Sequence, residues 1–395
     1  MNAVVVQKEN PVEVKRVDLL VVAGEPSGDQ HAAICVRELK KRHPQWSICA
    51  TGGPALEAAG AHLFINMMPF SAVGLMEVVS HYSRWKQLLR WLVEWVRVYQ
   101  PKMVCLVDFP GFNLRFAKAL YREHLSQKGG GSVKILGYIA PQIWAWKARR
   151  RFSMARWLDA LAVIFPFEPA GFADTNLPVY FVGYPLLQQP NPFRYDPQGA
   201  LLLLPGSRKS AVVRIFPLLQ EVFQQLRKQH PSLQAVVPFP NEAVGAYLKA
   251  QAGDDITICS VSNVSVGFCG AVMSSGTASL QVAFAGIPGV VTYRANPITF
   301  FCGKRLVKVP YLSMANLLLQ REAFPEILQN TPFQAIAIAR QMNLFLSDPE
   351  PAHARFLEDA HRLTELLSVP PQQSLLDVID TMMDECFLGL ESKRG

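Results

Sequence analysis

Strand-like apolar runs alternate with longer helical patterns along this chain of 395 residues. In the first half, the runs Leu19 to Val22, Met103 to Val107 and Lys134 to Ile139 are separated by segments with apolar residues at helical spacing. The alternation restarts at Leu201 to Leu204, and a helical pattern over Ile215 to Gln229 follows. Such alternation is typical of a parallel sheet with helices on both faces. The sequence therefore predicts an α/β protein with two Rossmann-like, doubly wound domains in tandem.

The segment from residue 188 to 199, QQPNPFRYDPQG, holds three prolines among mainly polar residues, which is typical of a linker. We expect a first domain over residues 1–190 and a second over residues 198–370. Two consecutive prolines then set apart residues 371–395, which carry a final amphipathic helix. We expect that helix to return to the first domain.

The composition is that of a well-buried globular protein, with half of the residues apolar and 18% charged. A formal net charge of +8 favours anionic partners, such as nucleic acid, phosphorylated small molecules or an acidic membrane surface. Seven cysteines without a CxxC motif favour a reducing cytoplasm and argue against structural zinc. The N-terminus lacks the length and cleavage site of a secretory signal, so we expect no export.

One stretch, from Ile256 to Tyr293, contains no charged residue, and a hydropathy scan would flag a transmembrane span there. Ser, Asn, Thr, Gly and Pro interrupt the stretch throughout. We therefore interpret it as buried strands of a parallel sheet.

Several common site motifs are missing from the sequence. It has no GxGxxG, no GxxxxGK[ST], no D-x-D pair and no GxSxG. These absences argue against a nicotinamide or flavin dehydrogenase, a P-loop kinase, a sugar-nucleotide enzyme that binds metal through D-x-D, and an α/β-hydrolase.

The segment LLLLPGSRKS (201 to 210) is a buried strand that runs into a turn. Gly206 would let backbone N–H groups approach an anion, Ser207 could donate a hydrogen bond, and Arg208 could clamp a phosphate in bidentate fashion. The alternative is an ordinary tight turn before a helix.

The segment SSGTASLQ (274 to 281) also follows a buried strand. Ser275, Gly276 and Thr277 would form a helix N-terminus, where unpaired N–H groups and the helix dipole favour phosphate. The alternative is a helix cap and nothing more. Because two anion-binding turns in one domain support each other, a nucleotide diphosphate is the leading ligand.

Asp108 ends an apolar strand in LVDFPGFNLRFAK (106 to 118), and Asn113 follows in the same segment. Open α/β sheets place their ligands at the carboxyl ends of the strands. As a catalytic residue Asp108 would be a general base for a sugar hydroxyl; the alternative is a helix cap or turn former.

Two segments combine cations with aromatic residues. Residues 138–157 hold five cations, among them Arg149, Arg150 and Arg151, with three tryptophans and no acid, a composition that suits nucleic acid, anionic lipid or plain solvation. In residues 80–99 an apolar sector that includes Trp91 and Trp95 is wider than one core contact needs. That helix is either enclosed in the protein or docked in a membrane interface.

Taken in order, these segments resemble the lipid A disaccharide synthase family, inverting glycosyltransferases of the two-domain GT-B fold. The matching segments are AGEPSGD (23 to 29), VGLMEVV (73 to 79), DFPGFN (108 to 113), APQIWAW (140 to 146), FPFE (165 to 168), PGSR (205 to 208), SSGTASL (274 to 280), and YRANPITF through KRLVKVPYLSMANLL (293 to 318).

The resemblance implies that UDP-2,3-diacylglucosamine donates its sugar to 2,3-diacylglucosamine 1-phosphate (lipid X), forming the β-1,6-linked lipid A disaccharide and UDP. The second domain would hold UDP, with Asn316 and Gln281 near the cleft. Asp108 would be the base, and Glu25 is a weaker rival for that role. No metal or other cofactor is expected.

The same resemblance implies partners and a location. The substrates place the enzyme on the cytoplasmic leaflet of the inner membrane as a peripheral protein, with Trp91, Trp95 and residues 149–151 on the membrane or acceptor surface. It implies no nucleic-acid partner and leaves a homodimer open. In AGEPSGD, Glu25 and Asp29 would face the acceptor, as hydrogen-bond partners of sugar hydroxyls or supports of the Asp108 loop.

Three positions depart from the family pattern. Ala211 and Gln281 stand where the family usually has glutamate, and Tyr184 stands where it usually has histidine. Two alternatives therefore stay open. One is another UDP-sugar enzyme of this fold, such as a transferase for a different lipid or an epimerase, and the other is a catalytically weak peripheral membrane homologue.

Overall fold

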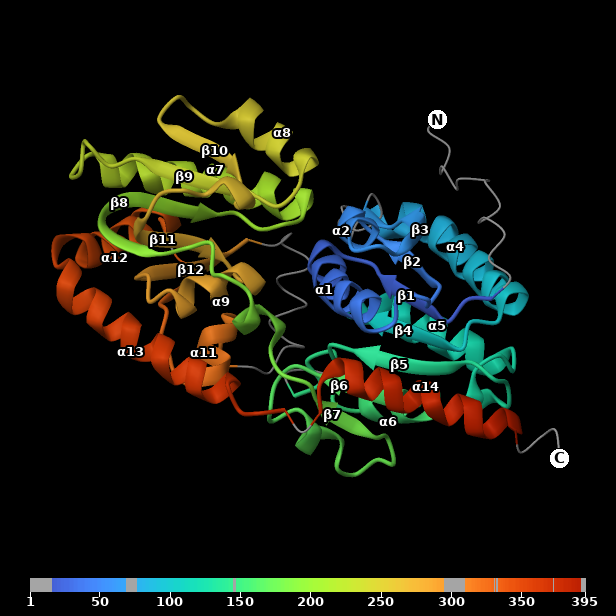
Figure 1. The fold of residues 1–395 in the computed structure, drawn as a ribbon. Coiled ribbons are helices and arrows are strands. Elements are labelled where there is room, and N and C mark those ends of the chain that lie inside the picture. Colours follow the sequence, from blue (N-terminus) through green and yellow to red (C-terminus); the bar gives the residue numbers. More distant parts are fainter. Residues whose placement is uncertain are drawn as a thin grey trace. The chain divides into compact units, whose positions relative to one another are not determined.

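A computed structural model describes residues 16–68, 77–144, 147–294, 310–329, 331, 333–371 and 373–391 (Figure 1). The chain divides into two compact units. Unit 1 contains residues 1–185 together with 369–395, and unit 2 contains residues 186–368. Each unit is built around one parallel sheet.

Unit 1 has a seven-stranded parallel sheet in the order β3-β2-β1-β4-β5-β6-β7. Its strands are β1 (Leu19–Ala23), β2 (Ile48–Gly52), β3 (His62–Asn66), β4 (Met103–Val107), β5 (Lys134–Tyr138), β6 (Ala160–Val163) and β7 (Val179–Phe181). Its α-helices are α1 (Pro26–Arg42), α2 (Pro54–Ala58), α4 (Glu77–Tyr99), α5 (Pro110–Arg122), α6 (Arg150–Trp157) and α14 (Leu375–Glu391). Helices α4, α5 and α6 contact one another in series, whereas α1 contacts α2 and α14. The strand order reverses between β1 and β4, which makes this pair the topological switch point of the sheet.

Unit 2 has a six-stranded parallel sheet in the order β10-β9-β8-β11-β12-β13. Its strands are β8 (Tyr195–Leu204), β9 (Ala235–Phe239), β10 (Ile256–Ser260), β11 (Phe268–Ser274), β12 (Gly289–Tyr293) and β13 (Glu326–Leu328). Its α-helices are α7 (Lys209–Arg227), α8 (Glu242–Gln251), α9 (Thr277–Phe284), α11 (Met314–Leu319), α12 (Gln334–Ser347) and α13 (Pro349–Leu367). Here the order reverses between β8 and β11. Two doubly wound sheets are what the alternation in the sequence predicts, and the fold class is confirmed.

The central strands read as unbroken apolar runs because helices cover both of their faces. Every residue of β1, β4 and β11 is buried. The uncharged stretch from Ile256 to Tyr293 supplies three of the strands of unit 2, as its interpretation as sheet requires. In the described part of the chain no helix is both long enough and apolar enough to cross a membrane.

Strand β8 begins at Tyr195, so the later part of the segment expected to be a linker is already sheet. The hydrogen-bonded register of β8 with β11 starts at the pair Ala200 and Phe268. Two hydrogen bonds of 3.0 Å flank residues 195–199: the N–H of Phe268 donates to the carbonyl of Arg194, and the N–H of Ala200 donates to the carbonyl of Gly267.

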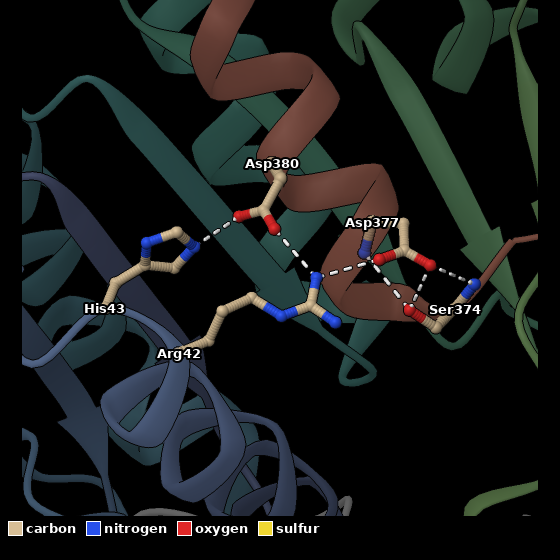
Figure 2. A network of polar contacts seen from close by, with 5 residues as sticks. All are labelled: Arg42, His43, Ser374, Asp377 and Asp380. Carbon is tan, nitrogen blue, oxygen red and sulfur yellow. Dashed lines mark hydrogen bonds and ion pairs between the residues drawn. The ribbon is translucent and has the colours of Figure 1, made fainter.

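The last helix, α14, belongs to unit 1. Arg42, at the end of α1, donates hydrogen bonds of 2.8 Å to both Asp377 and Asp380, and the ring of His43 contacts Asp380 at 2.7 Å (Figure 2). Ser374 caps the helix by accepting a 3.2 Å hydrogen bond from the N–H of Asp377, and its hydroxyl donates to the Asp377 carboxylate at 2.7 Å. The Ser374 and Arg42 bonds together hold the pKa of Asp377 below its usual value. The C-terminus of α1 and the N-terminus of α14 thus carry complementary charge.

The apolar sector of helix α4 is wide because the helix packs against two elements of unit 1. Trp95 is 4% exposed, and its ring stacks 4.8 Å from Phe64 of β3, while Trp91 is half-buried 5.7 Å from the same ring. On the neighbouring turn, Trp85 packs against Phe112 of α5. One face of α4 therefore covers β3 while the next covers α5. The expectation that Trp95 lies on a membrane surface is wrong, since the core of unit 1 encloses its ring; Trp91 also packs on that core.

Candidate active site

The switch point of unit 1 brings two predicted segments together. Ala23 pairs with Val107, so the turn that starts at Gly24 and the residue Asp108 leave the sheet side by side. A Cβ placed on Gly28 would lie 3.8 Å from the Cβ of Asp108. A Cβ on Gly24 would overlap the ring of Phe109, at 2.1 Å. Glycine is needed at position 24 because the two loops are in contact.

The backbone at Asp108 is strained and held by a buried amide. Asp108 and Phe109 are both left-handed, with φ of 48° and 47°. The N–H of Asp108 donates to the carbonyl of Tyr138 at 2.8 Å, and Asn113, 2% exposed, donates from its side chain to the carbonyls of Asp108 and Val107. Strain of this kind costs about 1–3 kcal/mol per residue and persists only where neighbouring groups enforce it. The half-buried Asp108 is thus presented at the carboxyl edge of the sheet in one fixed backbone conformation.

The two acids of the AGEPSGD turn have different environments. Glu25 is the residue before α1, is half-buried and makes no side-chain bond to the end of that helix. Asp29 is buried, and its carboxylate accepts from the N–H groups of Gly53 and Ala55, at 2.7 and 3.0 Å. Burial raises the pKa of Asp29 although these N–H groups oppose the shift. Asp29 caps α2, so the idea that it contacts sugar hydroxyls is wrong; Glu25 alone of the pair stays a candidate.

The switch point of unit 2 brings the two anion-binding turns together. Leu204 of β8 pairs with Met273 of β11, and the turns follow directly. Gly206 has φ of +112°, which favours glycine, and a Cβ there would lie 3.2 Å from the Oγ of Ser274. Arg208 precedes α7, and both it and Ser207 are exposed. The arginine is therefore at the surface of the same edge as the turn after β11.

The turn after β11 opens into helix α9. Gly276 precedes the helix, and a Cβ on it would meet nothing within 4 Å. The hydroxyl of Ser279 donates to the carbonyl of Gly276 at 2.6 Å, which fixes the first turn of the helix. Thr277 starts the helix, and its side chain lies outside the described residues. Space is therefore open beside Gly276, where a side chain would otherwise stand.

The side chain of Asn316 is part of a buried hydrogen-bond network within unit 2. Its side chain is fully buried, donates to the carbonyl of Phe324 and to Glu326, and accepts from the N–H of Phe324. The Glu326 carboxylate in turn accepts from the N–H groups of Leu312 and Ser313. Both amide hydrogens of Asn316 are therefore occupied within unit 2. Its neighbour Glu326, for which the sequence predicted no role, anchors the segment before α11.

The three departures from the family pattern lie at different depths. The side chain of Ala211 faces Gly206, 3.5 Å from where a Cβ there would lie. Gln281 is half-buried on α9, and its backbone carbonyl accepts a 2.7 Å hydrogen bond from Asn191. Tyr184 is buried in unit 1 with its ring 5.7 Å from that of Phe165. Only Ala211 adjoins the switch point of unit 2.

The arginine cluster lies around the start of α6. Arg149 is exposed, Arg150 is half-buried with a pKa lowered by burial, and Arg151 binds both carboxylate oxygens of Asp174. Phe152, next in sequence, is 49% exposed. The cluster thus presents cations and one aromatic ring at the surface of unit 1.

Glu168 is a further acid at the carboxyl edge of the unit 1 sheet, in the loop after β6. It is 4% exposed, and its carboxylate accepts from the N–H groups of Ile164 and Phe165, at 3.2 and 3.0 Å. Burial raises its pKa to about 7 against the effect of those bonds. Its segment, FPFE, is one of those that carry the family resemblance, but no role was predicted for the glutamate. An acid in the short loop after an apolar strand was the signal available there.

Among the described residues no group of three or more His, Cys, Asp or Glu side chains is placed to hold a metal ion.

Two parallel doubly wound sheets, each with its site loops at a switch point, define the class of the protein as GT-B. Solved structures agree on the fold. A putative UDP-N-acetylglucosamine 2-epimerase from Listeria monocytogenes superimposes with a TM-score of 0.57 at 11% identity, covering 91% of this chain and 99% of that one. Arabidopsis thaliana UGT89C1 complexed with quercetin gives a TM-score of 0.55 at 10% identity, covering 94% of this chain and 100% of that one.

Sequence comparison gives the family within that class. The family model for lipid-A-disaccharide synthetase matches residues 19–366. The lipid-A-disaccharide synthase of Geobacter sulfurreducens is 33% identical over 84% of this chain and 88% of its own length. Lipid-A-disaccharide synthase 1 of Legionella pneumophila is 32% identical over 93% of this chain and 98% of its own length. The chain belongs to the lipid-A-disaccharide synthase family, and the resemblance and enzyme class inferred from its motifs are confirmed.

Proposed function

We propose that this chain joins UDP-2,3-diacylglucosamine to lipid X, with unit 2 holding the donor and unit 1 the acceptor. The observation that carries this division is the chemistry at the two switch points. In unit 1 the edge of the sheet carries Asp108 and Glu25. In unit 2 the edge carries Gly206, Arg208 and the start of α9, without an acid in either turn. A carboxylate can accept a hydrogen bond or a proton from a sugar hydroxyl, whereas backbone N–H groups and an arginine donate hydrogen bonds to a diphosphate.

The proposed chemistry is one displacement. Asp108 takes the proton from the 6-hydroxyl of lipid X as that oxygen attacks C1 of the donor sugar from the face opposite the diphosphate. The bond from C1 to the diphosphate oxygen breaks, and UDP leaves with inversion to the β-linkage. Arg208 and the N-terminus of α9 stabilise the charge that develops on the diphosphate. In this proposal no metal takes part.

The acceptor is a lipid, so the proposal includes contact with the cytoplasmic leaflet of the inner membrane. The exposed Arg149 and Phe152 of unit 1 support it, because cations attract anionic headgroups and aromatic rings suit the interface. A homodimer stays a further proposal, which sedimentation of the purified protein would decide.

The test is turnover by the purified protein with both acylated substrates. We expect UDP release that depends on lipid X and continues in EDTA, together with one disaccharide product. UDP release without lipid X dependence would contradict the acceptor assignment, and loss of activity in EDTA would contradict the metal-free mechanism.

A second candidate is an epimerase, because a solved structure of similar fold carries that name. Conversion of UDP-N-acetylglucosamine in the absence of acceptor, followed by chromatography of the nucleotide sugars, would favour it. Binding to lipid vesicles without any turnover would favour a catalytically weak membrane homologue.

A further inference from the structure

Phe333, the residue before helix α12, combines an exposed aromatic ring with an unusual backbone. It is 80% exposed, and its φ of 49° lies in the left-handed region. A bulky residue is rarely found in that conformation, which persists only where the surroundings enforce it. Ile336, about one helical turn later, is 52% exposed. These two residues, the α12 apolar pair, put large apolar side chains at the surface of unit 2, as binding surfaces do.

Gln334 fixes the start of α12 at the carboxyl edge of the unit 2 sheet. Its buried side chain donates to the hydroxyl of Thr292 at 2.9 Å and to the carbonyl of Ile327 at 3.2 Å. Its side-chain oxygen accepts from the Nε of Arg294 at 2.9 Å. Thr292 lies near the end of β12, and Ile327 belongs to β13. The helix start, and the backbone of Phe333 with it, is therefore held where these two strands leave the sheet.

The same edge carries the two anion-binding turns. Ser274, the last residue before the turn at Gly276, pairs directly with Thr292. The hydroxyl of Ser275 in that turn donates to the carbonyl of Leu312 at 2.6 Å, which fixes the turn within unit 2. Neighbouring strands lie about 4.8 Å apart, so the turn and the start of α12 are separated by two strand spacings or fewer, on the order of 10 Å. An extended fatty acyl chain is longer than this separation.

The chain segment that carries the α12 apolar pair contains no charge. From residue 327 to residue 339 the sequence has no Asp, Glu, Lys or Arg, and the first cation of the helix is Arg340. Such a surface offers no ion pair to a phosphate or to a charged peptide, whereas it can remove a hydrocarbon chain from water. The donor in the proposed function carries two hydrocarbon chains on its sugar.

We infer that Phe333 and Ile336 contact an acyl chain of the donor, UDP-2,3-diacylglucosamine, and thereby make unit 2 select a donor with long acyl chains. The inference rests on the proposed function, which puts the donor at this edge of the sheet. The acyl chain extends from the sugar across the end of β12 to the α12 apolar pair. Burial of hydrocarbon against the ring adds affinity for the acylated donor and none for UDP, which has no acyl chain.

The experiment is steady-state kinetics in detergent micelles with wild-type protein and the variant Phe333→Asn. Asparagine removes the ring but tolerates the left-handed conformation, so the Tm should not fall. With the long-chain donor the variant should lose roughly tenfold in kcat/KM, mainly through a higher KM, because an aromatic contact with the chain is lost. With a donor analogue whose acyl groups are acetyl, kcat/KM should equal that of wild type. The Kd for UDP, measured by calorimetry, should not change.

Leu344→Gln is the matched control. Leu344 is 59% exposed on the same helix but lies about 15 Å further from the edge of the sheet, so this variant should keep wild-type kinetics with both donors. Equal losses of kcat/KM for the long-chain and the acetyl donor in Phe333→Asn, or no loss with either, would overturn the inference and leave the proposed function intact. Weaker flotation of Phe333→Asn with lipid vesicles at an unchanged donor KM would also overturn it, by assigning the ring to the membrane. Failure of the wild-type protein to release UDP from either donor would overturn both.

Discussion

The side-chain amide of Asn113 donates a hydrogen bond of 2.8 Å to the backbone carbonyl of Asp108. A second bond of 3.1 Å reaches the carbonyl of Val107, so one buried amide holds the end of β4 and the left-handed residue after it. Asn113 is a positioning residue for the proposed base, and it acts through the backbone.

Asn113→Ala should lower both stability and turnover. It leaves buried carbonyls without a donor, which predicts a loss of about 2–3 kcal/mol in the free energy of unfolding. It should also lower kcat, because the backbone strain at Asp108 loses its restraint, while the Kd for UDP stays unchanged. Urea unfolding and steady-state kinetics measure these two effects. A destabilised variant with full kcat at low temperature would show that Asn113 supports the fold only.

Asp108→Asn should fold normally and lose activity by about a hundred- to ten-thousand-fold, the usual worth of a positioned base. Asn is the better variant because Asn, like Asp, tolerates the left-handed conformation found here. Asp108→Ala should lose as much activity and in addition about 1–2 kcal/mol of stability. Turnover near the wild-type rate in Asp108→Asn would remove Asp108 from the mechanism.

Substitutions of Asp29 and Glu25 should have different effects, the first on stability and the second on use of the acceptor. Asp29→Ala removes the carboxylate that caps α2 and leaves the N–H groups of Gly53 and Ala55 without their acceptor, so we expect a loss of about 2–4 kcal/mol in stability. Glu25→Ala should raise the KM for lipid X more than the Kd for UDP. Thermal melts and kinetics with each substrate varied in turn would check both. Equal effects of Glu25→Ala on the two substrates would count against an acceptor role.

Membrane binding should depend on the surface around α6 and not on the tryptophans of α4. Phe152→Glu and Arg149→Glu should weaken flotation with vesicles that contain anionic lipid, with little change in Tm, because both side chains are exposed. Trp95→Ala should instead cost about 3–5 kcal/mol in stability, as for other buried aromatic residues. Flotation that resists both surface variants would place the membrane contact elsewhere.

Glu168 should make stability depend on pH. Its pKa is raised from 4.5 to about 7, so the folded state holds this proton more tightly than the unfolded state does. The free energy of unfolding should therefore fall as the pH rises from about 4.5 to 7, by on the order of 3 kcal/mol for this group. Glu168→Gln keeps an acceptor for the two N–H groups but cannot ionise. Between pH 4.5 and 7, the free energy of unfolding measured in urea should therefore fall less for Glu168→Gln than for wild type. An equal fall in both proteins would contradict the assignment.

The fold class and the main site segments could be predicted from local patterns. Apolar runs of strand length between helical patterns are a property of neighbouring residues, and so is a Gly-Ser-Arg turn after a strand. Since parallel strands present their carboxyl ends at one edge, Asp108 and Arg208 were expected to face ligands. Their partners were harder to predict. Asn113 stands five residues after Asp108, but its contact depends on the left-handed turn between them.

By itself, the sequence determined that this protein has two doubly wound sheets and that its chemistry lies in the turns after particular strands, because those signals are local. Only the tertiary structure decided which side chains remain available. Asp29 is taken by Gly53 and Ser275 by Leu312, partners that lie 24 and 37 residues away. The ring of Trp95 stacks on that of Phe64, a residue of β3. Hydrogen bonds and core contacts between distant segments form only once the sheets assemble, so no local pattern can reveal which polar groups they use up.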